Sequence, residues 1–307
     1  MSALQWRDWS CTVRIVLDDD RPTAVGPDPD TAEHVERIVR ELMDDVARSA
    51  SRFRDDSDLS RVNASAGRLV PVRRLTLELV EIALEAARRT DGACDPTVGH
   101  SLLAAGYDAD IRDVQARVSA TARSGGKPAD WQAVRVDTAL GRIGLPTGLA
   151  LDLGATAKAW TADQAAERLA RHLGLPALVA LGGDVAVSAD GPAWPIRVSE
   201  HEGGAGEVIG LRRGGVATSS TGGRTWLTTH GPAHHVIDPR SGAPVSGRYR
   251  TATVVGASCV DANTFSTAAL VWGTDAVTRL APYAARLVGT DGRVVTTETW
   301  PTVGVAA

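Results

Sequence analysis

Two oxygen-bearing side chains stand four residues apart at the start of an Ala-rich apolar run, residues 260–270. If this run is a helix, Asn263 and Thr267 share one face, because side chains at positions i and i+4 are helical neighbours. Their oxygens could then reach one hard cation or one phosphate. A simpler explanation is that Asp261 or Asn263 caps the helix and that Ser266 and Thr267 bond back to the preceding turn. The segment alone leaves both explanations open.

A second candidate site lies in residues 151–158. We expect Asp152 at the end of a strand, Gly154 in the turn that follows, and Lys158 near the first turn of a helix. Backbone N–H groups at a helix start, together with a lysine, form a natural anion site. The glycine spacings of a P-loop and of the dinucleotide-binding fingerprint are missing. A capped helix with a surface lysine is therefore an equal alternative.

A pair of histidines, His234 and His235, precedes the turn expected at residues 238–239. Adjacent side chains of a strand point to opposite faces, so at most one of these histidines faces a given site. An imidazole titrates near neutral pH and could accept a proton there, although histidines that merely flank a turn are the simpler explanation. Residues 216–224 add hydroxyls, glycines and Arg224, which suit either a polar ligand or an ordinary loop.

Apolar residues at helical or alternating spacing predict the elements that position these side chains. Helices are expected from residue 31, over 75–89, over 155–173, and as a pair at 264–272 and 275–285. Strands are expected at 12–17, 150–153, 178–187 (interrupted at Gly182-Gly183), 208–212, 215–218, 235–237 and 251–255. Residues 112–136 form a polar excursion that ends in a short strand, and Asp291-Gly292 predicts a hairpin turn. Because strands and helices occur in blocks as well as alternating, we expect an α+β fold of mixed sheets with flanking helices.

The composition of the 307-residue chain restricts its class: 43% of residues are hydrophobic, 23% are charged, and the formal net charge is −4. These values are typical of a globular protein and give no basic surface for nucleic acid. The three cysteines are widely spaced, which fits neither a disulfide framework nor a zinc cluster. No apolar run is long enough for a membrane span, and the first residues lack the core of a signal peptide. We therefore expect a cytoplasmic protein without a nucleic-acid partner.

Six segments, in this order, resemble the ApbE family of FAD:protein FMN transferases. They are residues 57–63, 95–99, 151–158, 181–184, 235–239 and 263–267. The set spans nearly the whole chain, which makes it far more specific than any single motif. The resemblance implies one ApbE-like domain over residues 1–307, with FAD in an extended crevice and Mg²⁺ beside its pyrophosphate.

The resemblance also implies roles for particular residues. The flavin dinucleotide would be contacted by Phe53, Ala104, Ala105, Gly106, Asp152, Lys158 and Ile237. Ala105 stands where some members have tryptophan. The metal would be held by the backbone carbonyl of Ala155 with Asn263 and Thr267. Asn263 stands where many relatives have aspartate, and since an amide oxygen brings no charge, the nearby Asp261 is a candidate substitute.

The activity that follows from the resemblance is Mg²⁺-dependent transfer of FMN from FAD to a Thr or Ser hydroxyl of an acceptor protein, with release of AMP. His235 is the expected base for the hydroxyl proton. Two alternatives use the same site: an FAD pyrophosphatase that forms FMN and AMP with water, and a non-catalytic FAD-binding protein. FAD and an acceptor flavoprotein are the expected partners.

Overall fold

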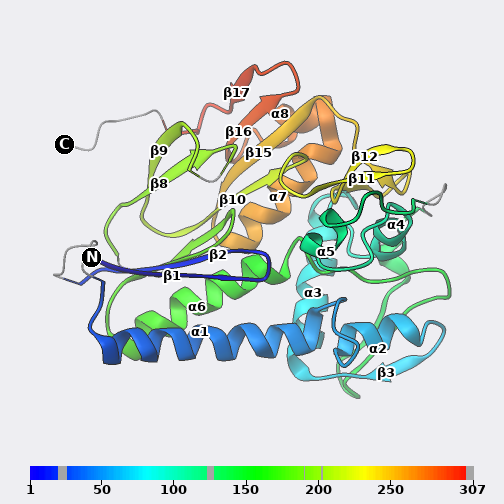
Figure 1. Cartoon of the computed structure of the whole chain (residues 1–307), viewed down its shortest axis with the longest axis horizontal. Helices are drawn as coiled ribbons and strands as arrows, with labels where there is room; N and C mark the ends of the chain where they lie inside the picture. Colours follow the sequence, from blue (N-terminus) through cyan, green and yellow to red (C-terminus); the bar gives the residue numbers. More distant parts are fainter. Residues whose placement is uncertain (20–25, 123–127, 190, 202, 302–307) are drawn as a thin grey trace.

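The computed structural model describes residues 1–19, 26–122, 128–189, 191–201 and 203–301. Within them, the main feature is an eight-stranded sheet in which each strand is antiparallel to its neighbours (Figure 1). Its order is β1 (Ser2–Asp8), β2 (Cys11–Leu17), β6 (Ala177–Leu181), β7 (Asp184–Val187), β10 (Gly214–Ser220), β15 (Tyr249–Gly256), β16 (Ala284–Gly289) and β17 (Val294–Thr296). The α+β fold expected from the sequence is confirmed.

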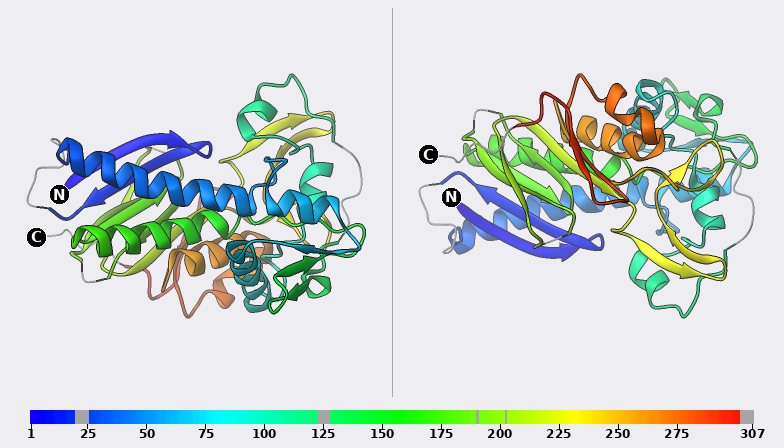
Figure 2. Two further views of the ribbon diagram at one scale, coloured as in Figure 1. Left: turned by 90° about the horizontal axis from the view of Figure 1, so that it is seen from below. Right: turned by 90° about the horizontal axis from the view of Figure 1, so that it is seen from above.

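Both faces of this sheet are covered, as alternating residues of one strand show. Ile15 packs into a core with α1 (Pro29–Ala50) and α6 (Ala157–Leu173), whereas its neighbour Val16 packs with the hairpin of β8 (Trp194–Ser199) and β9 (Gly206–Leu211). Helix α7 (Cys259–Trp272) lies beside α6 on the helical face (Figures 1 and 2). It is buried along most of its length because β10 and β15 cover it as well.

Smaller elements gather beside one end of the large sheet (Figure 1). The helices are α2 (Asp58–Ala64), α3 (Arg74–Arg89), α4 (Gly99–Ala104), α5 (Ile111–Gln115) and η1 (Trp131–Ala133), whereas η2 (Gly273–Asp275) and α8 (Ala276–Arg279) follow α7 and pack against it. The strands are β3 (Leu69–Pro71), β4 (Arg135–Asp137) and β5 (Arg142–Gly144), with the hairpins β11 (Thr225–Thr228)–β12 (Gly231–His234) and β13 (Ile237–Asp238)–β14 (Ala243–Pro244). A separate apolar cluster, which includes Leu102, Tyr107 and Trp226, joins α4, α5 and β11.

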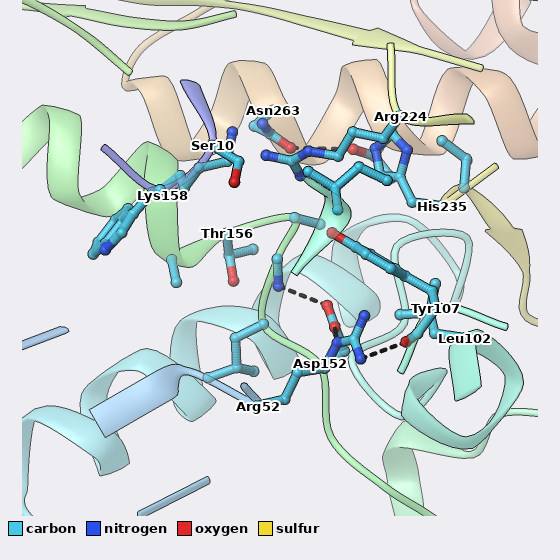
Figure 3. A pocket seen from close by; sticks show the side chains of 18 of the residues that line it. Ser10, Arg52, Leu102, Tyr107, Asp152, Thr156, Lys158, Arg224, His235 and Asn263 are labelled. Atoms are coloured by element: carbon cyan, nitrogen blue, oxygen red, sulfur yellow. Dashed lines mark hydrogen bonds and ion pairs between the residues drawn. The ribbon is translucent and has the colours of Figure 1, made fainter. Parts of the chain in front are cut away.

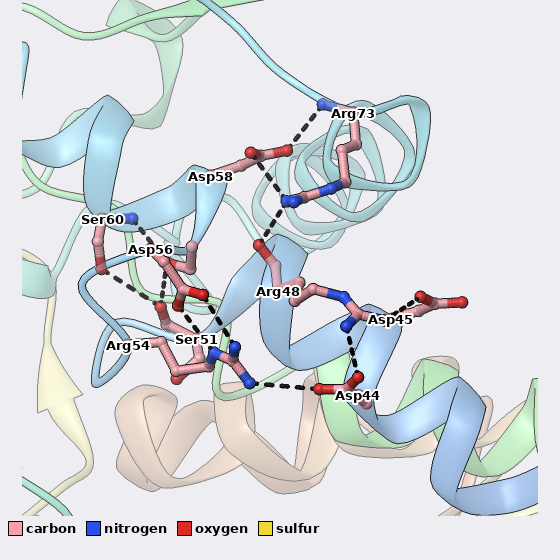
Figure 4. A network of polar contacts seen from close by, with 10 residues as sticks. Asp44, Asp45, Arg48, Ser51, Arg54, Asp56, Asp58, Ser60 and Arg73 are labelled. Atoms are coloured by element: carbon pink, nitrogen blue, oxygen red, sulfur yellow. Dashed lines mark hydrogen bonds and ion pairs between the residues drawn. The ribbon is translucent and has the colours of Figure 1, made fainter.

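A polar network fixes the segment that follows α1 (Figure 4). Asp58 is buried and accepts hydrogen bonds from the Arg73 backbone N–H and from Thr76 Oγ1, both at 2.7 Å. Burial disfavours the charge of Asp58, but these bonds outweigh it and lower its pKa. Arg54 bonds to Asp44 and Asp56 nearby. The first segment of the family resemblance therefore serves the scaffold, and it holds residues 51–57 in place.

Several expected elements are confirmed and several are wrong. Helices α1, α3 and α6, strand β2 and the β16–β17 hairpin occupy the expected places. Residues 151–153 form no strand, because their backbone bonds to a side chain and to loops, and Ala150 makes only an isolated bridge. Residues 178–187 are a hairpin, in which Gly182 adopts a φ of 64° at the turn.

Two further corrections concern the C-terminal part, whereas the excursion ends in a short strand as expected. His235 lies between β12 and β13 and not in a strand, and the helix expected at 275–285 is reduced to α8. The excursion at 112–136 includes part of α5, η1 and the start of β4; residues 123–127 lie outside the described part. In that described part, no helix has the length and apolar character needed to cross a membrane.

Candidate active site

A cavity of about 840 Å³ lies between the helical face of the large sheet and the group of smaller elements (Figure 3). Predicted site residues from distant parts of the chain converge on its wall. They are Phe53, Asp152, Ala155, Lys158, His235, Ile237, Asn263 and Thr267. The fold therefore brings most of the predicted site together around one space.

The start of α7 is capped without help from the candidate ligands. Ser258 is the N-cap, and Asp163 of α6 accepts the backbone N–H groups of Cys259 and Val260 at 2.8 and 3.1 Å. The alternative that Asp261 or Asn263 caps this helix is therefore wrong, although Ser266 Oγ does bond back to the preceding turn, at the Asn263 carbonyl, as that alternative expected. Asn263 lines the cavity with Thr267, whose Oγ1 donates to Asn263 Oδ1 at 3.1 Å.

Asp261 does not replace the missing carboxylate at position 263. Its side chain pairs with Arg89 of α3 and is not part of the cavity wall. The carboxylate next to Asn263 is instead Asp184, the first residue of β7. Asn263 Nδ2 donates to Asp184 Oδ1, and Lys158 Nζ lies 2.9 Å from Asp184 Oδ2. Asp184 belongs to a segment of the family resemblance, but its contacts with Asn263 and Lys158 were not predicted.

Asp152 is held by Arg52, which the sequence reasoning also missed. Arg52 Nε donates to Asp152 Oδ2 at 2.6 Å, and Arg52 Nη1 donates to the Tyr107 carbonyl at 2.7 Å. The guanidinium lies over the rings of Phe53 and Tyr107, 4.1 and 4.3 Å from their centroids. Asp152 Oδ1 accepts the N–H of Gly154. The pair therefore joins the turn before α6 to an aromatic group (Figure 3).

The expected flavin loop presents different residues from those predicted. Leu102 and Tyr107 belong to the cavity wall, whereas Ala104, Ala105 and Gly106 do not. The Ala105 carbonyl accepts from Trp226 Nε1 at 2.8 Å, and the Trp226 ring stacks on Tyr107 with centroids 5.0 Å apart. Gly106 has a φ of 89°, which glycine adopts without strain. These three residues shape the loop that carries Tyr107.

His235 and Arg224 lie together on the wall of the cavity (Figure 3). Burial lowers the pKa of His235 to about 3, helped by the positive charges of Arg224, His234 and Lys158. The imidazole is therefore neutral at pH 7 and has one nitrogen that can accept a proton. Arg224 has no ion-pair partner among the described residues, whereas His234 bonds to the Val245 carbonyl at 2.9 Å. Only one of the two histidines lines the cavity, as expected.

Part of the cavity wall suits a hard cation. Asp184, Asn263 and Thr267 are joined by hydrogen bonds and offer carboxylate, amide and hydroxyl oxygens, and Ala155 also lines the cavity. Over the described ranges, no three His, Cys, Asp or Glu side chains gather as a metal-ligating group. A mixed oxygen set fits Mg²⁺ and not a softer metal.

The fold and the cavity define an α+β protein with a cavity whose wall carries charged and aromatic side chains. The sequence model of the ApbE family matches residues 8–287, and the chain belongs to this family. The FAD:protein FMN transferase of Klebsiella pneumoniae is 27% identical over 269 residues, which are 82% of this chain and 75% of that protein. The enzyme of the same name from Treponema pallidum is 30% identical over 248 residues, 73% of this chain and 67% of that protein.

Solved structures share the fold. The ApbE protein of Thermotoga maritima is similar with a TM-score of 0.83 and 24% identity, over 97% of both chains. The flavinyl transferase ApbE of Pseudomonas stutzeri is similar with a TM-score of 0.75 and 23% identity, over 97% of this chain and 95% of that one.

Proposed function

We propose that this protein is a Mg²⁺-dependent FAD:protein FMN transferase, which moves FMN from FAD to a Thr or Ser hydroxyl of an acceptor protein and releases AMP. One observation carries the proposal: a single cavity is lined by oxygen donors, by cationic side chains and by aromatic rings. FAD has the matching parts, because a pyrophosphate lies between its two planar ring systems.

The side chains that line the cavity have defined tasks in this proposal. Lys158 and Arg224 bind the pyrophosphate, and the rings of Phe53 and Tyr107, with Ile237, bind a planar ring. Mg²⁺ would be held by the Ala155 carbonyl, Asn263 and Thr267, and when bound it neutralises charge on the pyrophosphate and the leaving phosphate.

The chemical step exchanges the phosphoanhydride bond of the FAD pyrophosphate for a phosphoester bond to the acceptor. The acceptor hydroxyl attacks the FMN-side phosphorus, the bond to the AMP-side oxygen breaks, and AMP leaves with that oxygen. His235 takes the hydroxyl proton, which typically contributes about 10²- to 10⁴-fold in rate. Arg224 and Lys158 both lower the pKa of His235. A pyrophosphate bound to them counters this effect and makes the imidazole a stronger base.

Incubation of the purified protein with FAD and Mg²⁺, with and without a candidate acceptor, tests the activity. Flavin attached covalently to the acceptor, seen by mass spectrometry together with AMP, is the expected result. Free FMN and AMP without an acceptor adduct would indicate a pyrophosphatase, and unchanged bound FAD would indicate a carrier. Acceptors are best sought in the cytoplasm, because Cys11, Cys94 and Cys259 are all free thiols, as is usual in a reducing compartment.

A further inference from the structure

We infer that Asp184 supplies the negatively charged ligand of the cation site and that Asn263 serves beside it as a neutral ligand. This inference rests on the proposed function and adds to it a residue for the metal. Asp184 follows the tight turn between β6 and β7, is 2% exposed, and belongs to the cavity wall.

The contacts of Asp184 link it directly to the other proposed ligands. Its Oδ1 accepts from Asn263 Nδ2, while Asn263 Oδ1 accepts from Thr267 Oγ1 at 3.1 Å. A carboxylate, an amide and a hydroxyl therefore follow one another along the wall. The two oxygens of a carboxylate offer about four acceptor positions. Among the described residues, only Asn263 and Lys158 contact the carboxylate oxygens of Asp184. The remaining acceptor positions of this carboxylate can therefore bind a cation.

The environment of Asp184 gives it a reason to bind a cation. An isolated buried carboxylate is strongly unfavourable, so such groups are paired or coordinate metals. Lys158 Nζ, 2.9 Å from Oδ2, shows that this carboxylate already attracts a positive charge. In contrast, Asp261 is satisfied by Arg89 and lies away from the wall. Asp184 is thus the carboxylate that faces Asn263 and Thr267.

A purely structural ion pair between Lys158 and Asp184 would also explain the burial, by tying α6 to β7. The two explanations differ in what an exchange of residues does. Asp184→Asn removes the carboxylate, whereas Asp184→Asn combined with Asn263→Asp returns one across the same hydrogen bond. If Asp184 is a metal ligand, this exchange should restore metal binding, because the site again contains one carboxylate and one amide.

Mn²⁺ serves as the probe, and its binding to the full chain is measured by electron paramagnetic resonance with saturating FAD and no acceptor. We expect Asp184→Asn to weaken Mn²⁺ binding about tenfold or more, and the double exchange to restore it to within about threefold. Asn263→Asp alone places two carboxylates in contact, so Mn²⁺ should raise its melting temperature more than that of the wild type. Asp261→Asn is the matched control and should bind Mn²⁺ as the wild type does.

Wild-type affinity in Asp184→Asn would overturn the inference while leaving a metal-dependent transferase intact. Failure of the wild type to bind Mn²⁺ with FAD present would instead remove the metal from the proposed function, and the inference with it. Melting curves show whether each variant is folded. If Asp184→Asn does not fold, the double exchange decides alone: restored affinity supports the inference, and lost affinity overturns it.

Discussion

Asn63 and Leu151 exchange two hydrogen bonds across the interface between α2 and the loop before α6. Asn63 Nδ2 donates to the Leu151 carbonyl at 2.9 Å, and Asn63 Oδ1 accepts the Leu151 N–H at 2.7 Å. Leu151 is fully buried, so its backbone groups have no access to water as a replacement. The side chain of Asn63 acts as a strand partner for this residue and sets the position of Asp152, which follows it.

Asn63→Ala leaves a buried N–H and a buried carbonyl without partners. We expect a loss of about 1–3 kcal/mol in the free energy of unfolding and weaker FAD binding, since Asp152 is no longer held. Urea unfolding and a flavin titration measure the two effects. Asn63→Asp is a useful comparison, because it keeps the acceptor for the Leu151 N–H but replaces the donor by a carboxylate oxygen that faces the Leu151 carbonyl, so it should also be destabilised. Wild-type stability in Asn63→Ala would contradict the role given to these bonds.

Arg52 and Asp152 form the second contact that fixes this loop, with side chains 9% and 16% exposed. Asp152→Asn leaves a buried guanidinium without its counter-charge, and breaking such a pair costs about 3–5 kcal/mol. Arg52→Met combined with Asp152→Asn should cost less than the sum of the two single changes, because no unpaired charge remains. A double-mutant cycle by urea unfolding measures this coupling. Strictly additive changes would show that the two side chains do not depend on each other.

The elements that the sequence predicted well are those with a local signal. The apolar face of α1 repeats along one helix, and Gly174, with a φ of 66°, ends α6 where the glycine indicated. The face shared by Asn263 and Thr267 depends on one helical turn, and their hydrogen bond confirms it. Helix α2 was missed because its seven polar-rich residues bury too few apolar side chains to show a period.

The parts of the site that were missed depend on contacts between distant residues. Asp184 and Asn263 are 79 positions apart, and Arg52 and Asp152 are 100 apart. Spacing within one segment contains no information about such pairs. Residues 151–153 were wrongly predicted as a strand for the same reason. Their apolar pattern is local, but the side chain of Asn63, which bonds to the Leu151 backbone in place of a neighbouring strand, comes from a distant part of the chain.

Burial and nearby positive charges lower the pKa of His235 to about 3, and this predicts how activity and stability depend on pH. As the pH is lowered, kcat/KM for FAD should not fall near pH 6.5, where an exposed histidine would become protonated, because His235 stays neutral there. Because the folded-state pKa is depressed, the stability that His235 contributes is complete above about pH 6.5 and declines as the pH falls toward 3.

His235→Asn tests the catalytic role of this residue. Loss of the base should lower the transfer rate about 10²- to 10⁴-fold without a comparable change in FAD affinity. The exposed His230 lies in the β11–β12 turn, and His230→Asn is the matched control. A transfer rate equal to the wild type in His235→Asn would exclude this histidine as the base. An inflection near pH 6.5 in the kcat/KM profile of the wild type that is absent from the profile of His235→Asn would contradict the lowered pKa.

Asp163 connects α6 to the start of α7, the helix that carries Asn263 and Thr267. Its carboxylate accepts the Cys259 and Val260 N–H groups, yet burial outweighs these bonds and raises its pKa from 3.8 to about 6. The folded protein therefore holds the proton more tightly than the unfolded chain. The stability contributed by this group is complete below about pH 4 and declines as the pH rises toward 6.

Asp163→Asn should remove this decline, because an amide resembles the protonated acid and does not ionise. We expect the variant to be within about 1 kcal/mol of the wild type at pH 4 and to lack the fall of about 2 kcal/mol that linkage assigns to the wild type between pH 4 and 6. Urea unfolding at a series of pH values gives both curves, with Asp55→Asn, an exposed carboxylate, as the control. Parallel curves for the wild type and Asp163→Asn would show that another group causes the dependence.

Asp163→Ala removes both acceptors at the start of α7, in addition to the charge. It should weaken Mn²⁺ binding, because the helix that positions Asn263 is then held less firmly.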